Sequence, residues 1–168
     1  SGKTTLLNRI LSEEHGQRIA VIENEYGEVG IDQGLVINAD EEVFEMSNGC
    51  ICCTVRGDLI RVLGNLMKRR DKFDYVLVET TGLADPLPVA MTINDLRDQL
   101  RLDSIITLVD AENFNEEILN SKIAKAQVIY GDILLLNKCD LVSEKRLSNI
   151  EKELNDIKTS PRIIRSVK

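Results

Sequence analysis

The sequence contains little cysteine, a single histidine and no long apolar run. Only four of its 168 residues are cysteine and one is histidine. No apolar stretch approaches the ~20 residues that a membrane-spanning helix needs, and we recognise no secretory signal peptide. These absences argue against membrane insertion and against structural disulfides. We therefore expect a cytoplasmic protein without a membrane partner, whose thiols are free or bound to metal.

Positive charge is also scarce, with 21 lysines and arginines against 28 acidic residues and a net charge of -7. Nucleic-acid binding draws its affinity from a basic face that releases counterions. We therefore expect no nucleic-acid partner. The one basic run, KRR at residues 68–70, is better explained as a helix end, where cations are favoured. The single histidine, His15, is also expected at a helix end or in solvent rather than as a metal ligand.

Apolar strands alternate with amphipathic helices along the whole sequence, 43% of which is hydrophobic. We predict strands at residues 18–24, 41–46, 73–80, 104–110, 132–138 and 161–167, and helices at 4–15, 56–70, 89–100, 116–127 and 143–157. Near-continuous apolar strands joined by helices indicate an α/β fold, with a mostly parallel sheet covered by helices on both faces. Ligands of such sheets bind beyond the carboxyl ends of the strands.

The sequence opens with half of a phosphate-binding motif, because Gly2, Lys3, Thr4 and Thr5 fit the end of the pattern G-x-x-x-x-G-K-[ST]. Gly2 would let the backbone N–H groups face phosphate oxygens, and Lys3 would reach the β- and γ-phosphates. The Thr4 hydroxyl would bind Mg²⁺, and the helix that follows would point its positive end at the anion. We expect residues 1–168 to be one P-loop NTPase domain, truncated before its first strand and within its last.

A second motif follows the apolar strand at residues 132–138, where Asn137, Lys138 and Asp140 form the arrangement N-K-x-D. A carboxylate at Asp140 can accept hydrogen bonds from N1–H and the 2-amino group of guanine, and adenine has neither donor. Two such bonds, at about 1.5–3 kcal/mol each, would separate the purines by about 10² to 10⁴. Lys138 can lay its alkyl stem on the base, and Asn137 can tie this loop to the P-loop. The alternative is an ordinary polar turn.

The stretch VETTGLADP, residues 78–86, has an acidic residue at the end of a buried strand followed by a glycine loop. In P-loop proteins this position senses Mg²⁺ and the γ-phosphate. Glu79 is the candidate for the metal's surroundings, and the Gly82 N–H for the γ-phosphate. Hydrolysis of GTP to GDP and phosphate would depend on Lys3, on Mg²⁺ at Thr4 and on a water near Glu79. We see no catalytic glutamine or arginine finger, so turnover should be slow.

Three of the four cysteines lie close together in NGCICC, at positions 50, 52 and 53. Thiolates suit Zn²⁺ and tolerate Co²⁺, and Cys50 and Cys53 have the C-x-x-C spacing that lets two sulfurs face one ion. Cys52 adds a third ligand, which leaves a fourth position open for metal exchange. A redox centre and inert packing are the alternatives. Cys139, in the variable position of N-K-x-D, is expected to be a small apolar residue.

Six stretches together resemble the CobW-like metallochaperone GTPases, a family that includes nitrile-hydratase activators and zinc-regulated GTPase metalloprotein activators. They are, in order, SGKTTLLN, IENEYGEVGID, NGCICC, ETTGLADP, LVDA and LLNKCDLV. The resemblance implies an N-terminal GTPase domain followed by a smaller C-terminal domain that this sequence does not contain. It also implies that Glu23 and Glu28, in the first switch loop, are metal ligands. Some relatives carry a histidine after VDA, and this sequence has none there.

The function we expect is that of a GTP-hydrolysing metallochaperone. It would bind Zn²⁺, or Co²⁺, through the C-x-C-C motif and deliver it to a client metalloprotein in step with the nucleotide. Self-association into a homodimer is a further option for its partners. One rival is a regulatory GTPase that acts by partner binding and holds a structural zinc. Another is an ATP-dependent kinase, which would have no preference for guanine.

Overall fold

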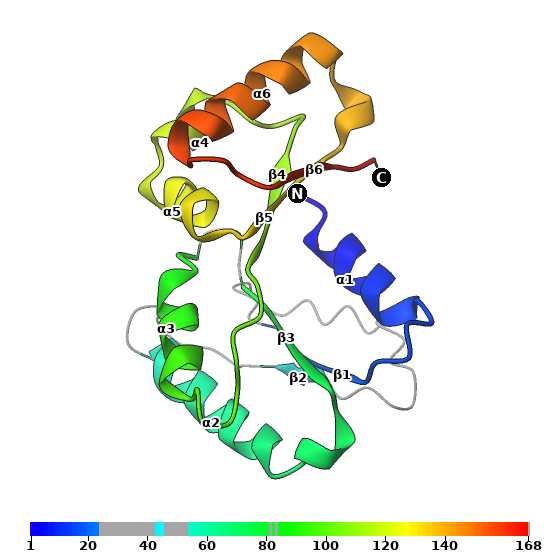
Figure 1. The fold of residues 1–168 in the computed structure, drawn as a ribbon, viewed down its shortest axis with the longest axis vertical. Helices are drawn as coiled ribbons and strands as arrows, with labels where there is room; N and C mark the ends of the chain where they lie inside the picture. Colours follow the sequence, from blue (N-terminus) through cyan, green and yellow to red (C-terminus); the bar gives the residue numbers. More distant parts are fainter. Residues whose placement is uncertain (24–42, 46–53, 81, 83, 168) are drawn as a thin grey trace. The chain divides into compact units, whose positions relative to one another are not determined.

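The computed structural model describes residues 1–23, 43–45, 54–80, 82 and 84–167. The chain divides into two compact units (Figure 1), one formed by Thr4–Ala84 and the other by Ser1–Lys3 together with Asp85–Lys168. Each unit contains a three-stranded parallel sheet, and we call them the β1–β3 unit and the β4–β6 unit after their strands. The predicted α/β class with parallel strands is confirmed.

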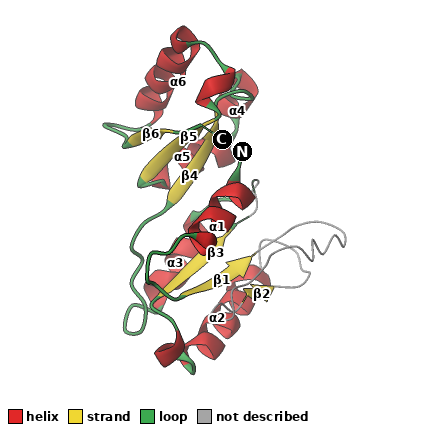
Figure 2. Cartoon of the chain, turned by 90° about the vertical axis from the view of Figure 1, so that its right-hand side faces the viewer, coloured by secondary structure: helices red, strands yellow, loops and turns green. Residues whose placement is uncertain are grey.

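The β1–β3 unit orders its strands β2-β1-β3, so that β1 is central. Its elements are α1 (Lys3–Ser12), β1 (Ile19–Glu23), β2 (Val43–Glu45), α2 (Thr54–Met67), the short 3₁₀ helix η1 (Arg70–Lys72) and β3 (Tyr75–Glu79). Figure 2 shows α1 and α2 on opposite sides of this sheet. The sheet is therefore covered by a helix on each face.

Strand β1 is buried on both faces because its side chains alternate between two helical layers. Ile19 and Val21 pack against Leu7 and Leu11 of α1. Residues 20 and 22 alternate with them toward the other face, and both are buried. This explains why β1 is a continuous apolar run rather than an alternating one.

The β4–β6 unit orders its strands β4-β5-β6, with β5 in the centre. Its elements are α3 (Leu87–Asp95), β4 (Ile106–Asp110), α4 (Glu116–Asn120), α5 (Lys122–Tyr130), β5 (Ile133–Asn137), the 3₁₀ helix η2 (Cys139–Leu141), α6 (Glu144–Ile157) and β6 (Ile163–Arg165).

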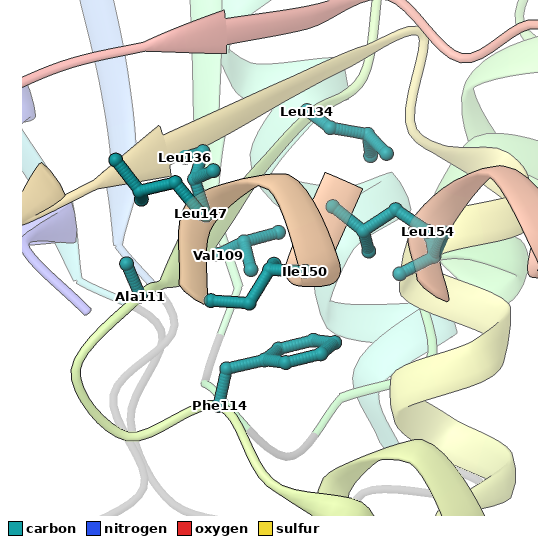
Figure 3. Packing of buried hydrophobic residues seen from close by; sticks show 9 residues of the cluster. Val109, Ala111, Phe114, Leu134, Leu136, Leu147, Ile150 and Leu154 are labelled. Carbon is teal, nitrogen blue, oxygen red and sulfur yellow. The ribbon is translucent and has the colours of Figure 1, made fainter. Parts of the chain in front are cut away.

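Helix α6 closes the core of the β4–β6 unit over the central strand. Leu147, Ile150 and Leu154, spaced by three and four residues, lie on one face of α6 and belong to the same buried cluster as Leu134 and Leu136 of β5 (Figure 3). The helix starts at Ser143, whose side chain accepts a hydrogen bond of 3.2 Å from the backbone N–H of Arg146. A packed and capped α6 therefore holds β5 in place.

Strand β6 is fixed to α6 by ion pairs from Arg165. Its Nε lies 2.6 Å from Oε1 of Glu151, and its Nη1 lies 2.8 Å from Oε1 of Glu144. These hydrogen bonds, above all the one that Arg165 donates to Glu151, raise the pKa of Arg165. The segment that follows β6 begins with Ser166, whose backbone N–H donates to the carbonyl of Leu136 in β5 at 2.8 Å.

The structure corrects the prediction of a single helix over residues 116–127. Two helices are present, and they meet at Ser121, which has an extended backbone. The Ser121 N–H donates to the carbonyl of Ile118 at the end of α4. The Ser121 hydroxyl caps α5 by accepting a hydrogen bond from the N–H of Ala124. A serine that ends one helix and starts the next matches the helical periodicity of both, so periodicity alone does not reveal the break.

Other element ends shift by a few residues, and α3 begins two residues earlier and ends five residues earlier than predicted. His15 follows α1 and satisfies local backbone groups, since its Nε2 donates to the carbonyl of Ile10 at 2.8 Å and its Nδ1 accepts from the N–H of Gln17. Among the described residues, none of the helices has the length and apolar character to cross a bilayer.

The buried α6 face predicts a large loss of stability for Ile150→Ala. Ile150 is fully buried, so truncation leaves a cavity and should lower the free energy of unfolding by about 2–5 kcal/mol. Ile164→Ala, at a β6 side chain that is 40% exposed, is the matched control and should cost less than about 1 kcal/mol. Urea unfolding followed by circular dichroism measures both. Equal losses would contradict the packing of α6 on β5.

Candidate functional site

The carboxyl ends of β4 and β5 bring together side chains that are far apart in the sequence. In the parallel ladder Asp110, the last residue of β4, is in register with Asn137, the last residue of β5. Parallel strands end at a common edge, so the loops after β4, β5 and β6 lie close to one another. The polar residues of N-K-x-D begin at this edge.

Asn137 is buried, being 9% exposed, and its side-chain amide is bonded on both sides. Its Nδ2 donates to the backbone carbonyl of Ser1 at 3.1 Å. Its Oδ1 accepts a hydrogen bond of 2.9 Å from the hydroxyl of Ser166, which follows β6. One amide therefore joins the start of the chain, the end of β5 and the segment after β6.

Gly2 lies directly against this amide. Its backbone has a φ of 98°, an angle that residues other than glycine rarely adopt. A Cβ atom at this position would collide with Nδ2 of Asn137. Glycine is therefore needed here twice, for its backbone angle and for its lack of a side chain. Lys3, the next residue, is half-buried and begins α1.

Lys138 adopts the left-handed conformation, with a φ of 61°, and its ammonium is held by two carboxylates. Its Nζ lies 2.9 Å from Oδ2 of Asp110 and 3.0 Å from Oε2 of Glu112. The hydrogen bonds to Asp110 and Glu112 raise the pKa of Lys138. Burial opposes ionisation of Asp110, but hydrogen bonds from Lys138 and Asn113 outweigh it and lower the pKa of Asp110 to about 2. The Asp110–Lys138 pair is therefore fully ionised at neutral pH.

Asp110 also shapes the loop that follows β4. Its Oδ1 accepts from the backbone N–H groups of Glu112 at 3.1 Å and Asn113 at 3.2 Å. Its Oδ2 accepts from the Nδ2 of Asn113 at 3.0 Å. These bonds form a turn of the type that aspartate commonly makes with its own backbone.

Asp140 lies in η2, is exposed, and follows the left-handed turn at Lys138. The intervening Cys139 is half-buried and packs against the apolar cluster below α6. Its thiol donates to the carbonyl of Leu136, and its N–H donates to the carbonyl of Ser166 at 3.1 Å. The left-handed turn at Lys138 thus places Cys139 toward the apolar cluster and leaves the Asp140 carboxylate accessible to a ligand.

The remaining predicted phosphate and magnesium residues belong to the β1–β3 unit. Thr4 and Thr5 are exposed in the first turn of α1. Glu79 is half-buried at the end of β3, and Gly82 is exposed in the following loop. Gly2 and Lys3, by contrast, belong to the β4–β6 unit, together with Asn137, Lys138 and Asp140.

Three neighbouring strands of the β1–β3 unit end in glutamate at the same register. Glu23 of β1 is paired with Glu45 of β2 on one side and with Glu79 of β3 on the other. Glu45 was not predicted as a site residue from the sequence. Only the register, which depends on long-range pairing, places it beside Glu23.

The predicted thiolate ligands Cys50, Cys52 and Cys53, and the predicted ligand Glu28, lie outside the described residues. Glu23 is described by its backbone alone. Where side chains are described, no group of three histidine, cysteine or acidic residues is arranged to hold a metal ion. Metal binding by this chain therefore stays a prediction from the sequence.

Sequence reasoning missed Ser166, Asp110 and Glu112. The available signal was positional, because LVD and RSV end predicted strands of the same parallel sheet and so reach the same edge. Neither stretch shows which residues it contacts, and the partners of Glu112 and Ser166 lie 26 and 29 residues away.

Comparison with known proteins places the chain in a family. The family model described as CobW/HypB/UreG, nucleotide-binding domain, matches residues 1–165. The zinc-regulated GTPase metalloprotein activator 1 of Dictyostelium discoideum is 39% identical over 206 residues, covering 99% of this chain and 43% of that protein. The zinc chaperone YjiA of Escherichia coli is 42% identical over 151 residues, covering 86% of this chain and 48% of YjiA. The chain thus spans less than half the length of these curated relatives.

Solved structures agree with the fold predicted from the sequence. The crystal structure of the Zn(II)-bound YjiA GTPase from E. coli superposes with a TM-score of 0.73 at 35% identity, covering 98% of this chain and 53% of that one. The hydrogenase maturation factor HypB from Archaeoglobus fulgidus, at 16% identity and a TM-score of 0.67, shares the fold. The P-loop fold is confirmed.

Gly2→Ala should cost more stability than the same substitution at another left-handed glycine. Gly16 has a φ of 74° and nothing within 4 Å of its added Cβ, so Gly16→Ala measures backbone strain alone, about 1–2 kcal/mol. Gly2→Ala adds the displacement of the Asn137 amide, whose lost hydrogen bonds should cost about 1–3 kcal/mol more. Urea unfolding compares the two variants, and the NMR signal of the Asn137 side-chain amide reports its displacement. Equal costs with an unmoved amide signal would refute the contact.

Proposed function

The chain belongs to the CobW/HypB/UreG family of nucleotide-binding domains, and from this premise we propose that it forms the GTP-binding and GTP-hydrolysing part of a metallochaperone. The cargo would be a transition metal, with Zn²⁺ favoured over Co²⁺ by thiolate chemistry. The recipient would be a client metalloprotein. Two relatives, a zinc-regulated activator and a zinc chaperone, support this proposal.

The single observation that carries the nucleotide half of the proposal is the hydrogen bond between Asn137 and the Ser1 carbonyl. Within one compact unit it joins the loop with the N-K-x-D pattern to Ser1–Lys3, which contains the first two residues of the G-K-T-T pattern. One motif suits a guanine base and the other suits phosphates, and a nucleotide contains both. Two separate chance matches would have no reason to be bonded to each other.

The proposed base contact follows from the exposure of Asp140. Its carboxylate can accept from N1–H and the 2-amino group of guanine, while the stem of Lys138 lies along the base. Asn137 is committed to protein partners on both sides of its amide, so its role is to hold the loop. Selectivity for guanine would therefore rest on Asp140.

Phosphate binding and hydrolysis are proposed for Lys3, Thr4, Glu79 and Gly82. Lys3 would neutralise the β- and γ-phosphates, and the Thr4 hydroxyl would bind Mg²⁺ at the start of α1, whose positive end favours anions. Glu79, at the end of β3, would hold a water or a water ligand of the metal. Magnesium would supply the charge that stabilises the transferring phosphoryl group.

The proposed cargo site combines Cys50, Cys52 and Cys53 with Glu23 and Glu28. Three thiolates satisfy Zn²⁺ and leave a position through which metal can leave. Glu23 directly ends β1, next to Glu79 in the ladder, so nucleotide-dependent movement of one strand end would reach a metal ligand on the next. We propose that GTP and Mg²⁺ favour the metal-holding state and that hydrolysis releases the ion.

Asp140→Asn should move nucleotide preference from guanine to xanthine. The carboxamide has one donor and one acceptor, so it clashes with the 2-amino group of guanine but pairs with the 2-carbonyl and N1–H of xanthine. GTP affinity should fall about 10- to 100-fold or more, since hydrogen bonds to a charged group are lost. Dissociation constants for GTP, XTP and ATP, measured by displacement of a fluorescent nucleotide, give the answer.

Gain of XTP binding distinguishes a changed specificity from a damaged fold. Asp156→Asn, an exposed aspartate on α6, is the matched control and should keep the native order of affinities. If native protein bound ATP as well as GTP, the guanine-selective proposal would be wrong and the kinase alternative would gain.

Metal affinity of the full-length protein should depend on the nucleotide. With a non-hydrolysable GTP analogue, Zn²⁺ should bind about tenfold more tightly than with GDP, a coupling of ordinary size for linked sites. Cys50→Ser, Cys52→Ser and Cys53→Ser should each weaken Zn²⁺ binding, because a hydroxyl is a poor zinc ligand at neutral pH. Competition with a chromophoric chelator measures the affinities.

Cys139→Ser is the control for the thiol variants, since this thiol packs against the apolar cluster and bonds a backbone carbonyl that serine can also reach. Equal zinc affinity in both nucleotide states would reject the coupling. Zinc that resisted nucleotide exchange and excess chelator would instead indicate a fixed structural ion, as expected for a regulatory GTPase that acts through partner binding.

A further inference from the structure

We propose that Asp110 and Glu112 are positioning residues for the guanine nucleotide, which act by fixing the ammonium of Lys138. This inference rests on the proposed function, because it assigns the loop after β4 to the same nucleotide site. It adds two acidic side chains that lie outside the G-K-T-T and N-K-x-D motifs. Their contribution would be to hold the Lys138 stem in the position that the base requires.

The geometry of Lys138 makes such positioning necessary. A lysine side chain has four rotatable bonds, and ordering it costs up to about 2 kcal/mol of rotamer entropy. In the structure this cost is met before a ligand arrives, because Nζ lies 2.9 Å from Asp110 and 3.0 Å from Glu112. With its backbone in the left-handed turn and its ammonium bound, the stem is fixed at both ends. Preorganisation of this kind raises affinity by removing an ordering cost.

The two carboxylates differ in how firmly they are held. Asp110 is 14% exposed, ends a strand, and accepts hydrogen bonds from two backbone N–H groups and the Asn113 amide. Glu112 is 49% exposed and lies on the rim of the loop. We therefore assign the main anchoring role to Asp110 and a smaller one to Glu112.

The loop that carries these carboxylates is itself tied to the core. Phe114 is buried, and its carbonyl accepts a hydrogen bond of 2.6 Å from Nη2 of Arg146 on α6. Asn115 then caps α4 by accepting from the N–H of Ile118 at 3.0 Å. Because the loop is fixed at both ends, it can hold Asp110 and Glu112 at a constant position relative to the Lys138 ammonium.

A purely structural ion pair is the competing explanation. Solvent-exposed pairs contribute little to folding, about 0–1 kcal/mol, but Lys138 and Asp110 are only 21% and 14% exposed, so this pair also stabilises the fold. The Asp110–Lys138 pair lies at the carboxyl edge of the sheet, where ligands of parallel sheets bind, and one of its members belongs to the base motif. We therefore expect its removal to lower nucleotide affinity as well as stability.

A double-mutant cycle in the full-length protein tests this. Asp110→Asn keeps the acceptor for the loop turn but removes the charge, and Lys138→Met keeps the stem but removes the ammonium. Each alone should weaken GDP binding about fivefold, which corresponds to about half of the rotamer entropy of an unrestrained lysine side chain. Because both break the same interaction, Asp110→Asn should have no further effect in the Lys138→Met protein. Glu112→Gln should weaken GDP about twofold, in line with its exposure.

An affinity ratio and a control variant separate positioning from a structural effect. Asp110→Asn should leave the ratio of GDP to ADP affinity unchanged, because Asp140 is intact, and its urea curve should show that it is fully folded under the conditions of the binding assay. Asp103→Asn, which removes a charge of an exposed pair with Arg101, is the matched control and should not alter GDP binding. Independent effects of Asp110→Asn and Lys138→Met that multiply in the double variant would overturn the inference.

A measurement without nucleotide separates this inference from the proposed function. Acylation of Lys138, followed by mass spectrometry, should proceed faster in Asp110→Asn than in the native protein, because the ammonium loses its partner. Native protein that protected Lys138 but failed to bind GDP would show that the ion pair exists and that the proposed function, with this inference, is wrong. Unchanged acylation together with normal GDP binding would reject the inference alone.

Discussion

The side-chain amide of Asn137 is the contact on which the candidate site depends. It donates to the Ser1 carbonyl and accepts from the Ser166 hydroxyl, so it fixes the loops after β5 and β6 and the beginning of the chain in one place. A buried amide that lost either partner would be left unsatisfied, at about 1–3 kcal/mol. The arrangement also explains Gly2, since a Cβ there would occupy the space of the amide. Residues at opposite ends of the sequence therefore constrain one another.

The parallel sheet also determines which residues meet at the candidate site. In a parallel ladder all carboxyl ends point to one edge, and the turns that leave the strands determine which side chains meet there. Asp110 ends β4 with a turn onto its own backbone, while Lys138 leaves β5 through a left-handed residue. These two turns bring opposite charges to within 2.9 Å of each other. The same logic aligns Glu23, Glu45 and Glu79 at the ends of the other sheet.

Much of the fold could be predicted because local patterns dictate it. The apolar runs ending at Glu79, Asp110 and Asn137 are strands, and their parallel pairing follows from the helices between them. Register could not be predicted, since it depends on packing between distant segments. For this reason Glu45, Ser166 and the Asp110–Lys138 pair were not predicted as parts of the site. The break at Ser121 was missed for the opposite reason, because a single hydroxyl overrides a helical period that continues on both sides. Residue types at strand ends were thus predictable, and their partners were not.

The two halves of the proposed cycle depend on pH through different groups. The pKa of Asp110 is lowered to about 2 and that of Lys138 is raised, so their pair keeps its charges throughout the neutral range. The single histidine is bonded to backbone groups next to α1 and takes no part in it. A thiol, by contrast, must lose its proton to bind zinc, and an unperturbed cysteine does so only near pH 8.5. Loading of metal through the proposed ligands Cys50, Cys52 and Cys53 would therefore depend on pH in a range where the Asp110–Lys138 pair keeps its charges.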